Sequence, residues 1–539
     1  MHNASPVPIR TRRGEGRSDE PAHRAARETA PAPRGPTLRR PAAGAAAGAL
    51  TRARMLARAA AAETLTLAAI AAAMLIVTST ATSDTASLSV CPSGCPYTKI
   101  QAAVEAASSG DTITVDPGTY VEGSGRPGTS SLTIAKSLTI DGAGAGLVTI
   151  EPAPGTIGNN GSAGNSPARY DAAGNVVAIS SPDPAKPISV SISGVTVNGE
   201  GARSTVDSGV AFTDATGSLT NSVVTNIDQY RTGIQAGIGV TVYSDQSYGA
   251  FPVSLGGDDI NGYSKGGVYV DGTGQPAGSG VVATISHTTI AGAGLQAFQT
   301  QNGLFIGDGA SAIVTQSVVS GNYYTGPGNS DGVILWGPNG LASTSITSSD
   351  IENNGVGIIS VGRYGGPTAI PIHDDRFAGN LIAVDNYDPS VANRLDVTDD
   401  WWGCNGGPNA PRCQTTNPAS GAAAPAFGSW LTLDATASAD RAPARGSTTI
   451  TASLTSTRPG AHAGAAPAPD GTPVSFSTNL GAIRSPVGML GGRATGTLDA
   501  GSTPGTADVV ASLDEQSVRV APITVIAPTH AAARGPNRR

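Results

Sequence analysis

Five aspartates near the end of a repeated segment are the residues best placed to do chemistry. They occur one repeat apart, as Asp350, Asp374–Asp375 and Asp399–Asp400. Carboxylates gathered from neighbouring repeats can hold Ca²⁺, which takes six to eight oxygen ligands. The candidate calcium ligands are Asp374, Asp375, Asp399 and Asp400.

The same carboxylates support two other interpretations. Two of them could act as general acid and general base on a glycosidic bond, which makes Asp350, Asp375 and Asp400 catalytic candidates. Arg376 lies beside them and could pair with a uronate carboxylate. Alternatively, these aspartates are ordinary turn residues whose side chains are solvated or cap the local backbone.

Aromatic residues form a second candidate site. Exposed aromatic rings beside polar residues suit sugars, because a sugar stacks its C–H face on a ring while its hydroxyl groups are hydrogen-bonded. The alternative is that many of these rings fill the interior. The candidate ligand-binding residues are Tyr243, Tyr248, Tyr263, Tyr323 and Trp336.

A repeat must position both sets of residues. Each copy has a polar lead-in, a pair of strand-forming residues and then Asn or Gly. The equivalent apolar positions are Val197, Val224, Ile260, Ile290, Val319, Ile351, Phe377 and Trp401, at steps of 27, 36, 30, 29, 32, 26 and 24 residues. Steps of this size without a helical pattern predict the coils of a parallel β-solenoid. Equivalent positions of adjacent coils would then lie ~4.8 Å apart.

The segment before the repeat gives a family resemblance. In Tyr97-Thr-Lys-Ile-Gln-Ala-Ala-Val104 the apolar residues have helical spacing, which predicts a helix that covers the first coil and ends by Gly110. The strand motifs Gly110-Asp-Thr-Ile-Thr-Val-Asp-Pro-Gly-Thr-Tyr120 and Lys136-Ser-Leu-Thr-Ile-Asp-Gly-Ala-Gly144 follow. Together they resemble the N-terminal coils of the pectin-lyase-like superfamily. This resemblance implies an all-β fold with a right-handed parallel β-helix over residues 91–415.

The superfamily includes lyases, hydrolases, epimerases and adhesins, so the resemblance implies no single activity. The polygalacturonase-type motifs Gly-His-Gly and Arg-Ile-Lys are missing from this sequence. The pectate-lyase pattern of long Trp- and His-bearing motifs is missing too. No catalytic residue of the family is therefore carried over.

A second domain follows the repeat. Alternating apolar residues separated by Gly, Pro and Asp predict a β-sandwich over residues 430–527, after a linker at 416–429. The motifs Asp470-Gly-Thr-Pro-Val-Ser-Phe-Ser-Thr-Asn-Leu-Gly481 and Ala494-Thr-Gly-Thr-Leu-Asp-Ala-Gly501 resemble the invasin/intimin-type bacterial Ig-like domain (group 1). That resemblance implies a spacer or adhesive module. Residues 528–539 are expected to be a disordered tail.

The N-terminal region predicts export. Residues 1–54 are rich in Arg, Ala and Pro and are expected to be disordered. Residues 55–86 contain the apolar run Leu65–Val77, which has the length of a signal-peptide core and is short for a membrane span. Met55 is an alternative start, and an uncleaved anchor is the alternative to a cleaved signal peptide.

Cysteine spacing supports an oxidising compartment. The four cysteines form the pairs Cys91–Cys95 and Cys404–Cys413. Zinc would require two-residue spacings or nearby histidines, so the spacing favours two local disulfides at the two ends of the repeat.

Charge and composition narrow the function further. The chain has 539 residues, 71 of them Gly, and a net charge of −7. Residues 1–58 carry 12 Arg against four acidic residues, which leaves −15 for the rest and argues against a nucleic-acid partner. We expect a secreted or cell-surface monomer that binds a polysaccharide or a cell-surface glycan, with Ca²⁺ as the one candidate cofactor. Membrane contact would occur only through an uncleaved N-terminal segment. The alternatives are a lyase or hydrolase of acidic polysaccharides and a structural envelope protein.

Overall fold

The computed structural model describes most of residues 87–527. The exceptions are residues 127, 157–173, 201–204, 228–235, 245, 247–248, 273–279, 327, 338–342, 363–368, 388–394, 418–423 and 460–467. The predicted N-terminal extension (1–54), signal segment (55–86) and tail (528–539) all lie outside the described residues.

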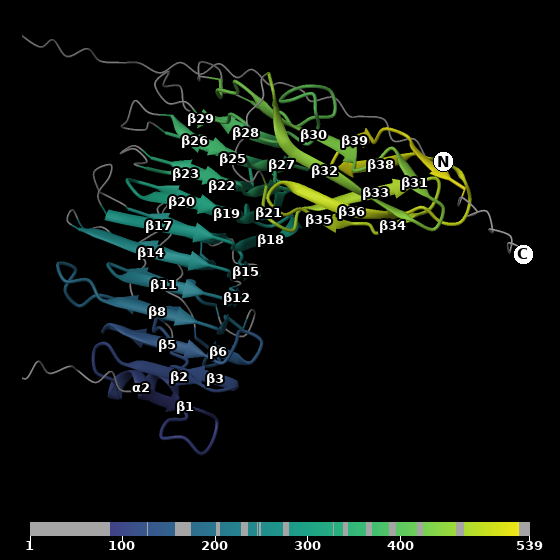
Figure 1. Cartoon of the computed structure of the whole chain (residues 1–539). Coiled ribbons are helices and arrows are strands. Elements are labelled where there is room, and N and C mark those ends of the chain that lie inside the picture. The colour runs from purple at the N-terminus through teal and green to yellow at the C-terminus, as the bar shows by residue number, and fades with distance from the viewer. Residues whose placement is uncertain are drawn as a thin grey trace, which may run out of the picture. The chain divides into compact units, whose positions relative to one another are not determined.

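Three parallel sheets wind around a shared core and form the predicted β-helix (Figure 1). Sheet A holds β1 (Ser87–Val90), β2 (Thr112–Val115), β5 (Leu138–Gly142), β8 (Ser189–Ser193), β11 (Thr216–Thr220), β14 (Ala250–Gly256), β17 (Gly280–Ser286), β20 (Ser311–Thr315), β23 (Ser345–Thr347), β26 (Ile370–His373) and β29 (Leu395–Asp396). Sheet B holds β3 (Gly118–Glu122), β6 (Val148–Pro152), β9 (Thr196–Asn198), β12 (Val223–Thr225), β15 (Asp259–Asn261), β18 (Thr289–Gln296), β21 (Val318–Tyr324), β24 (Asp350–Glu352) and β27 (Arg376–Ala378). Sheet C holds β4 (Leu132–Ile134), β7 (Asn175–Ser180), β10 (Ser208–Thr213), β13 (Ile238–Tyr243), β16 (Gly266–Asp271), β19 (Asn302–Gly307), β22 (Asp331–Trp336), β25 (Val356–Val361) and β28 (Ile382–Asn386).

The register of sheet B confirms the repeat except at its last step. Its core column runs from Val197 through Val224, Ile260, Ile290, Val319 and Ile351 to Phe377, as the sequence predicts. Trp401, however, pairs with Arg376 rather than with Phe377. Trp402 instead joins the β-helix core, with its ring centroid 5.0 Å from that of Phe377. The last coil is therefore one residue longer than the alignment assumed.

A short helix covers the first coil, as predicted. This helix is α2 (Ile100–Ala106), and it buries Ile100, Ala103 and Val104 against the core. The carboxylate of Glu122 accepts the N–H groups of Ile100 (2.7 Å) and Gln101 (3.3 Å), so a side chain from β3 satisfies the free amides at the helix start.

The strands after residue 429 form a β-sandwich of mostly antiparallel strands. They are β30 (Trp430–Ala437), β32 (Ser447–Arg458), β36 (Arg493–Asp499) and β34 (Ala482–Ile483) in one sheet, β31 (Arg441–Pro443), β40 (Ile523–Ile526) and β37 (Gly505–Ala507) in a second, and β35 (Val487–Gly488), β33 (Pro473–Thr478), β38 (Val509–Leu513) and β39 (Gln516–Arg519) in a third. In β36 alternate residues are buried, which is the pattern of a sheet with one face on a core.

Both predicted disulfides are present, Cys91–Cys95 and Cys404–Cys413. Among the residues that the structure describes, no helix has the length and apolar character needed to cross a membrane.

Candidate functional site

Asp375 and Asp400 lie inside the turns that connect sheet A to sheet B. Neither side chain is exposed to solvent. The Asp375 carboxylate accepts the Ser349 N–H (2.6 Å), and the Asp400 carboxylate accepts the Asp375 N–H (2.8 Å). Burial raises the pKa of both groups well above the usual range, and repulsion from nearby carboxylates, such as Asp374 for Asp375 and Asp375 for Asp400, adds to the shift. This position supports backbone capping rather than contact with a polysaccharide.

The same capping contact recurs in other coils. Side-chain oxygens of Ser222, Asp258, Ser317 and Ser349 each accept the N–H of the equivalent residue one coil earlier, at 2.9–3.3 Å. Asp258 is also buried, and desolvation raises its pKa to about 7. The position takes Ser, Thr or Asp, so the acidic residues at 375 and 400 are two members of a structural ladder.

Asp374 and Asp399 precede the ladder at the left-handed position of each turn, with φ of 60° and 62°. Asp and Asn tolerate this conformation better than most other residues. Within the described residues, the only group of three or more His, Cys, Asp or Glu residues with ligand atoms all within 4.8 Å is Cys91, Cys95 and Asp116. Its two sulfurs form a disulfide. No group of three or more that includes Asp374, Asp375, Asp399 or Asp400 meets this spacing among the described residues, and calcium binding there stays a prediction.

Asp350 belongs to a different column from Asp375. It pairs with Arg376 across β24 and β27, whereas the Asp375 carboxylate accepts the N–H of Ser349 in the coil before. Arg376 is only 7% exposed and contacts Asp350 (3.2 Å), Glu352 (2.7 Å) and Asp514 of the sandwich (2.5 Å). Burial raises the pKa of Asp350 to about 7, although the adjacent guanidinium lowers it. The alignment that gathered Asp350, Asp375 and Asp400 into one acid/base set was therefore wrong by one residue, which turns their side chains to different surroundings.

The predicted aromatic residues divide into buried and accessible groups. Tyr243 and Tyr263 are 7% and 2% exposed, so the prediction that they bind a ligand through an open ring is wrong. The Tyr263 hydroxyl donates to Asn322 (2.8 Å), at one end of a buried asparagine ladder that continues through Asn354 and Asn380. Tyr248 lies outside the described residues. Tyr323 is half-buried, and Trp336 is 42% exposed.

Exposed apolar side chains instead border sheet C. The described residues contain nine large hydrophobic side chains that are well exposed, and five of them flank this sheet. Leu295 and Phe298 precede β19, Leu381 directly precedes β28, Trp336 ends β22 and Tyr387 directly follows β28. We call the outer surface of sheet C between these two edges the sheet C face.

Strands β18 and β21 extend the first edge. Both are longer than the neighbouring strands β15 and β24 of sheet B. A bulge after Ala291 brings Leu295 of β18 opposite Tyr323 of β21. The extension carries Leu295 at 66% exposure, and Phe298 follows it at 63%. Thr300 then leads the chain into sheet C, so these apolar side chains stand beside the start of β19.

Ionisable groups lie at the same edge. Lys265 precedes β16 and donates to the Thr300 hydroxyl (3.0 Å) and the Thr300 carbonyl (3.3 Å). Asp331 begins β22, is 6% exposed, and its Oδ1 has no hydrogen-bond partner among the described residues. Desolvation lowers the pKa of Lys265 to about 8 despite the opposing charge of Asp331. Desolvation also raises the pKa of Asp331 to about 7, against the effect of Lys265.

Two aromatic side chains of sheet C lie near these ionisable groups. The rings of Tyr269 and Phe305, from adjacent strands of sheet C, have centroids 5.0 Å apart. Burial raises the pKa of Tyr269 to about 12, although a hydrogen bond from Asn302 opposes the shift. The Tyr269 hydroxyl is therefore neutral near pH 7 and can take part in hydrogen bonds as a donor.

Sequence reasoning missed Lys265, Asp331, Leu295 and Phe298 because it aligned only the repeat of sheet B. A second repeat is present in sheet C, in which a Gly precedes an aliphatic residue at the start of each strand. Its copies begin at Ser208, Ile238, Gly266, Asn302, Asp331 and Val356. This pattern would have put Asn302 and Asp331 in one column with Gly266. Lys265, one of the four lysines of the chain, directly precedes Gly266.

Comparison with known proteins gives similarity in fold only. No family model and no curated protein matches the chain. Among solved structures, the A-module of mannuronan C-5 epimerase from Azotobacter vinelandii aligns with a TM-score of 0.39 and 16% identity, over 56% of this chain and 72% of that one. Pectin methylesterase from carrot aligns with a TM-score of 0.27 and 12% identity, over 62% and 77%.

The D0-D1 domain of intimin aligns with a TM-score of 0.15 and 22% identity, over 20% of this chain. This chain spans about half of that intimin structure, 53% of its length. These similarities are too weak to assign an activity, so the function must be argued from the residues of this chain.

Proposed function

We propose that this protein binds a polysaccharide on the sheet C face. The observation that carries the proposal is the concentration of exposed apolar side chains at the two edges of sheet C, with Lys265 at one of them. Exposed apolar side chains that gather near a few polar groups are typical of a binding surface.

The chemistry of the surface suits sugar rings. Phe298 is 63% exposed and Trp336 is 42% exposed, so part of each ring surface is accessible to the C–H face of a sugar. Lys265, which is half-buried at the first edge, supplies a hydrogen-bond donor there. A cation that is held partly out of solvent also favours a sugar carboxylate over a hydroxyl group, which supports a uronate-containing polysaccharide as ligand.

We further propose that the protein works outside the cytoplasm. Two disulfides are typical of exported proteins, and the apolar run at Leu65–Val77 has the length of a signal-peptide core. The sandwich after the β-helix would then extend the binding surface from its point of attachment. This arrangement would make the protein adhesive.

Binding to immobilised polygalacturonate and to neutral xylan tests the proposal with the full chain. We expect Phe298→Ala and Trp336→Ala each to weaken binding by about tenfold, because each removes one stacking surface worth about 1.4 kcal/mol. Leu490→Ala is the matched control, since Leu490 is 73% exposed and belongs to the sandwich rather than to the β-helix. Equal effects of all three variants, or no binding by the wild type, would refute the proposal.

Lys265 and Asp331, which lie at the same edge of sheet C, make an enzyme the second candidate function. Their pKa values of about 8 and about 7 leave part of the lysine neutral and part of the aspartate protonated near neutral pH. In an elimination, neutral Lys265 would take the proton next to the uronate carboxyl group. The electron pair would form a C=C bond as the C–O bond to the next sugar breaks, and protonated Asp331 would protonate the leaving oxygen.

The same binding samples separate these two functions. New ultraviolet absorbance from unsaturated sugars, abolished by Lys265→Met and by Asp331→Asn, would make the protein a lyase. New reducing ends without that absorbance would indicate a hydrolase. Binding without either product supports the non-catalytic function.

A further inference from the structure

Two neighbouring tryptophans belong to different hydrophobic cores. Trp402 lies in the core of the β-helix, and Trp401 lies in the core of the sandwich. Both side chains are fully buried. The last coil of the β-helix thus supplies a core residue to the sandwich, and the sandwich core would be incomplete without it.

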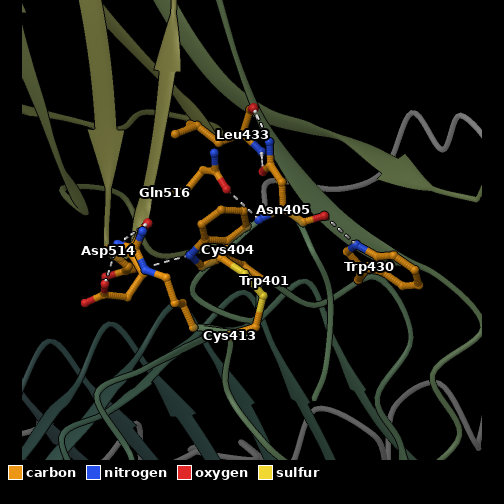
Figure 2. The surroundings of a disulfide bond; sticks show 10 residues. Trp401, Cys404, Asn405, Cys413, Trp430, Leu433, Asp514 and Gln516 are labelled. Atoms are coloured by element: carbon orange, nitrogen blue, oxygen red, sulfur yellow. Dashed lines mark hydrogen bonds and ion pairs between the residues drawn. A yellow bond between two sulfur atoms is a disulfide. The ribbon is translucent and has the colours of Figure 1, made fainter. Parts of the chain in front are cut away.

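The hairpin turn of the sandwich at Asp514 contacts the last two coils through buried charge. Arg376 donates to both oxygens of Asp514, through Nε (3.0 Å) and Nη2 (2.5 Å). The indole N–H of Trp401 donates to the same carboxylate at 2.7 Å (Figure 2). Loss of the Asp514 carboxylate would break this buried ion pair, and a buried pair that loses one partner is strongly destabilised.

The loop after Trp401 makes further contacts. Asn405 accepts the Leu433 N–H (2.7 Å) and donates to the Leu433 carbonyl (3.0 Å), so its side chain pairs with β30 as a strand would. Its own N–H donates to Gln516 (3.0 Å), and its carbonyl accepts the indole N–H of Trp430 (3.1 Å). Figure 2 shows this loop between Leu433, Gln516 and Trp430, with the Cys404–Cys413 disulfide at its base.

A third segment of the sandwich reaches earlier coils. The Ala468 N–H donates to the Asp374 carbonyl (2.9 Å), and the Asp470 N–H donates to Gln316 (3.0 Å). The Thr472 hydroxyl contacts Asp350 at 3.3 Å. These contacts come from the turns that carry the acidic residues, so the cluster that the sequence indicates as a site is a contact surface for the sandwich.

We infer that the sandwich is the C-terminal cap of the β-helix and that the two parts fold as one cooperative unit. The last coil of a solenoid leaves backbone groups and core side chains without a further coil to cover them. Here β30 continues from that coil, with Trp430 bridged to Asp400, and the described residues of the β-helix and the sandwich belong to one compact unit. The sandwich is therefore a fixed extension of the β-helix rather than a module on a flexible linker.

Cleavage of the intact chain within residues 418–423 tests this inference. A specific protease site is inserted there, the full chain is cut, and the products are analysed by gel filtration. We expect the wild-type fragments to elute together. Wild-type fragments that separate while both stay soluble and keep their circular dichroism spectra would overturn the inference.

Variants locate the contact surface in the same assay. Asp514→Asn keeps the size of the side chain but removes its charge, and we expect its fragments to separate at least tenfold more readily than those of the wild type. Arg412→Met is the matched control, because Arg412 pairs with Glu515 in an exposed contact of 3.0 Å and is 72% exposed.

Calorimetry of the uncut chain gives an independent result. We expect one transition for the wild type, and for Asp514→Asn either a lower midpoint or a split into two transitions. Two well-separated transitions in the wild type would contradict cooperative folding, whatever the variants do.

Discussion

The turn position that holds Asp375 shows how one structural role can be met by different side chains. Ser317, Ser349 and Asp375 occupy this position in successive coils, and each accepts a backbone N–H from the coil before. A hydroxyl oxygen meets this need without charge. A carboxylate meets it too, but its second oxygen is buried without a hydrogen-bond partner among the described residues.

Substitution of Asp375 should separate its structural role from a catalytic one. We expect Asp375→Ser to fold, because serine caps the same turn at 317 and 349. Asp375→Ala should lose about 1–3 kcal/mol of unfolding free energy, because the Ser349 N–H is left unpaired in a buried site. Urea denaturation measures both. Equal stability of the two variants would contradict the capping role.

The pH dependence of stability follows from the raised pKa of Asp375. A carboxyl group whose pKa is raised in the folded state binds more protons there than in the unfolded chain, so stability falls as pH rises above the unfolded value of about 4. We expect the free energy of unfolding of the wild type to fall between pH 5 and pH 8, and that of Asp375→Ser to fall less. A steeper fall in the variant would contradict this sign.

Among the elements, the strands of sheet C depend on a column of glycines. A Cβ atom on Gly303 would lie 2.6 Å from the Gly332 carbonyl oxygen and 2.4 Å from a methyl group of Val319. The equivalent Gly332 and Gly357 show the same approach to the next coil, at 2.6 Å and 2.5 Å. Backbone atoms of stacked coils cannot move apart without breaking the ladder between them, so a side chain does not fit here.

A single methyl group at this column should therefore be costly. We expect Gly303→Ala to reduce the free energy of unfolding by about 1–3 kcal/mol through overpacking. Gly146→Ala is the control, because its Cβ would meet no atom within 4 Å, and its effect should be within about 1 kcal/mol, neutral or stabilising. Thermal unfolding of both variants measures the difference, and a stable Gly303→Ala would show that the coils can separate locally.

The repeats that could be read from the sequence were those with regular side chains. The β-branched pairs of sheet B identify the coils because each coil buries the same position. The last register failed at Trp401 because two adjacent tryptophans fit the same column, and only packing decides that Trp402 enters the β-helix core. The site on sheet C was missed for a different reason. Its apolar residues lie at strand ends and in connections, where exposure depends on tertiary structure rather than on periodicity.

At the scale of the whole molecule, charge opposes an anionic ligand from a distance. Residues 59–539 carry a net charge of −15, whereas Lys265 is the one lysine at the sheet C face within the part of the chain that the structure describes. Long-range repulsion is screened by salt at separations beyond about 10 Å in 0.1 M salt, but a contact between Lys265 and a bound carboxylate is screened much less. Salt should therefore remove the repulsion before it weakens the contact.

This balance predicts an unusual salt dependence for binding. We expect the association rate for polygalacturonate to rise severalfold between 0.01 M and 0.1 M NaCl, because the Debye length falls from about 30 Å to about 10 Å. Binding of neutral xylan should change little over the same range and serves as the control. Surface plasmon resonance with the full chain measures both rates. A rate for polygalacturonate that falls with salt would mean that a basic surface guides the ligand, and the sheet C face, with its single lysine, would then be the wrong site for an acidic polysaccharide.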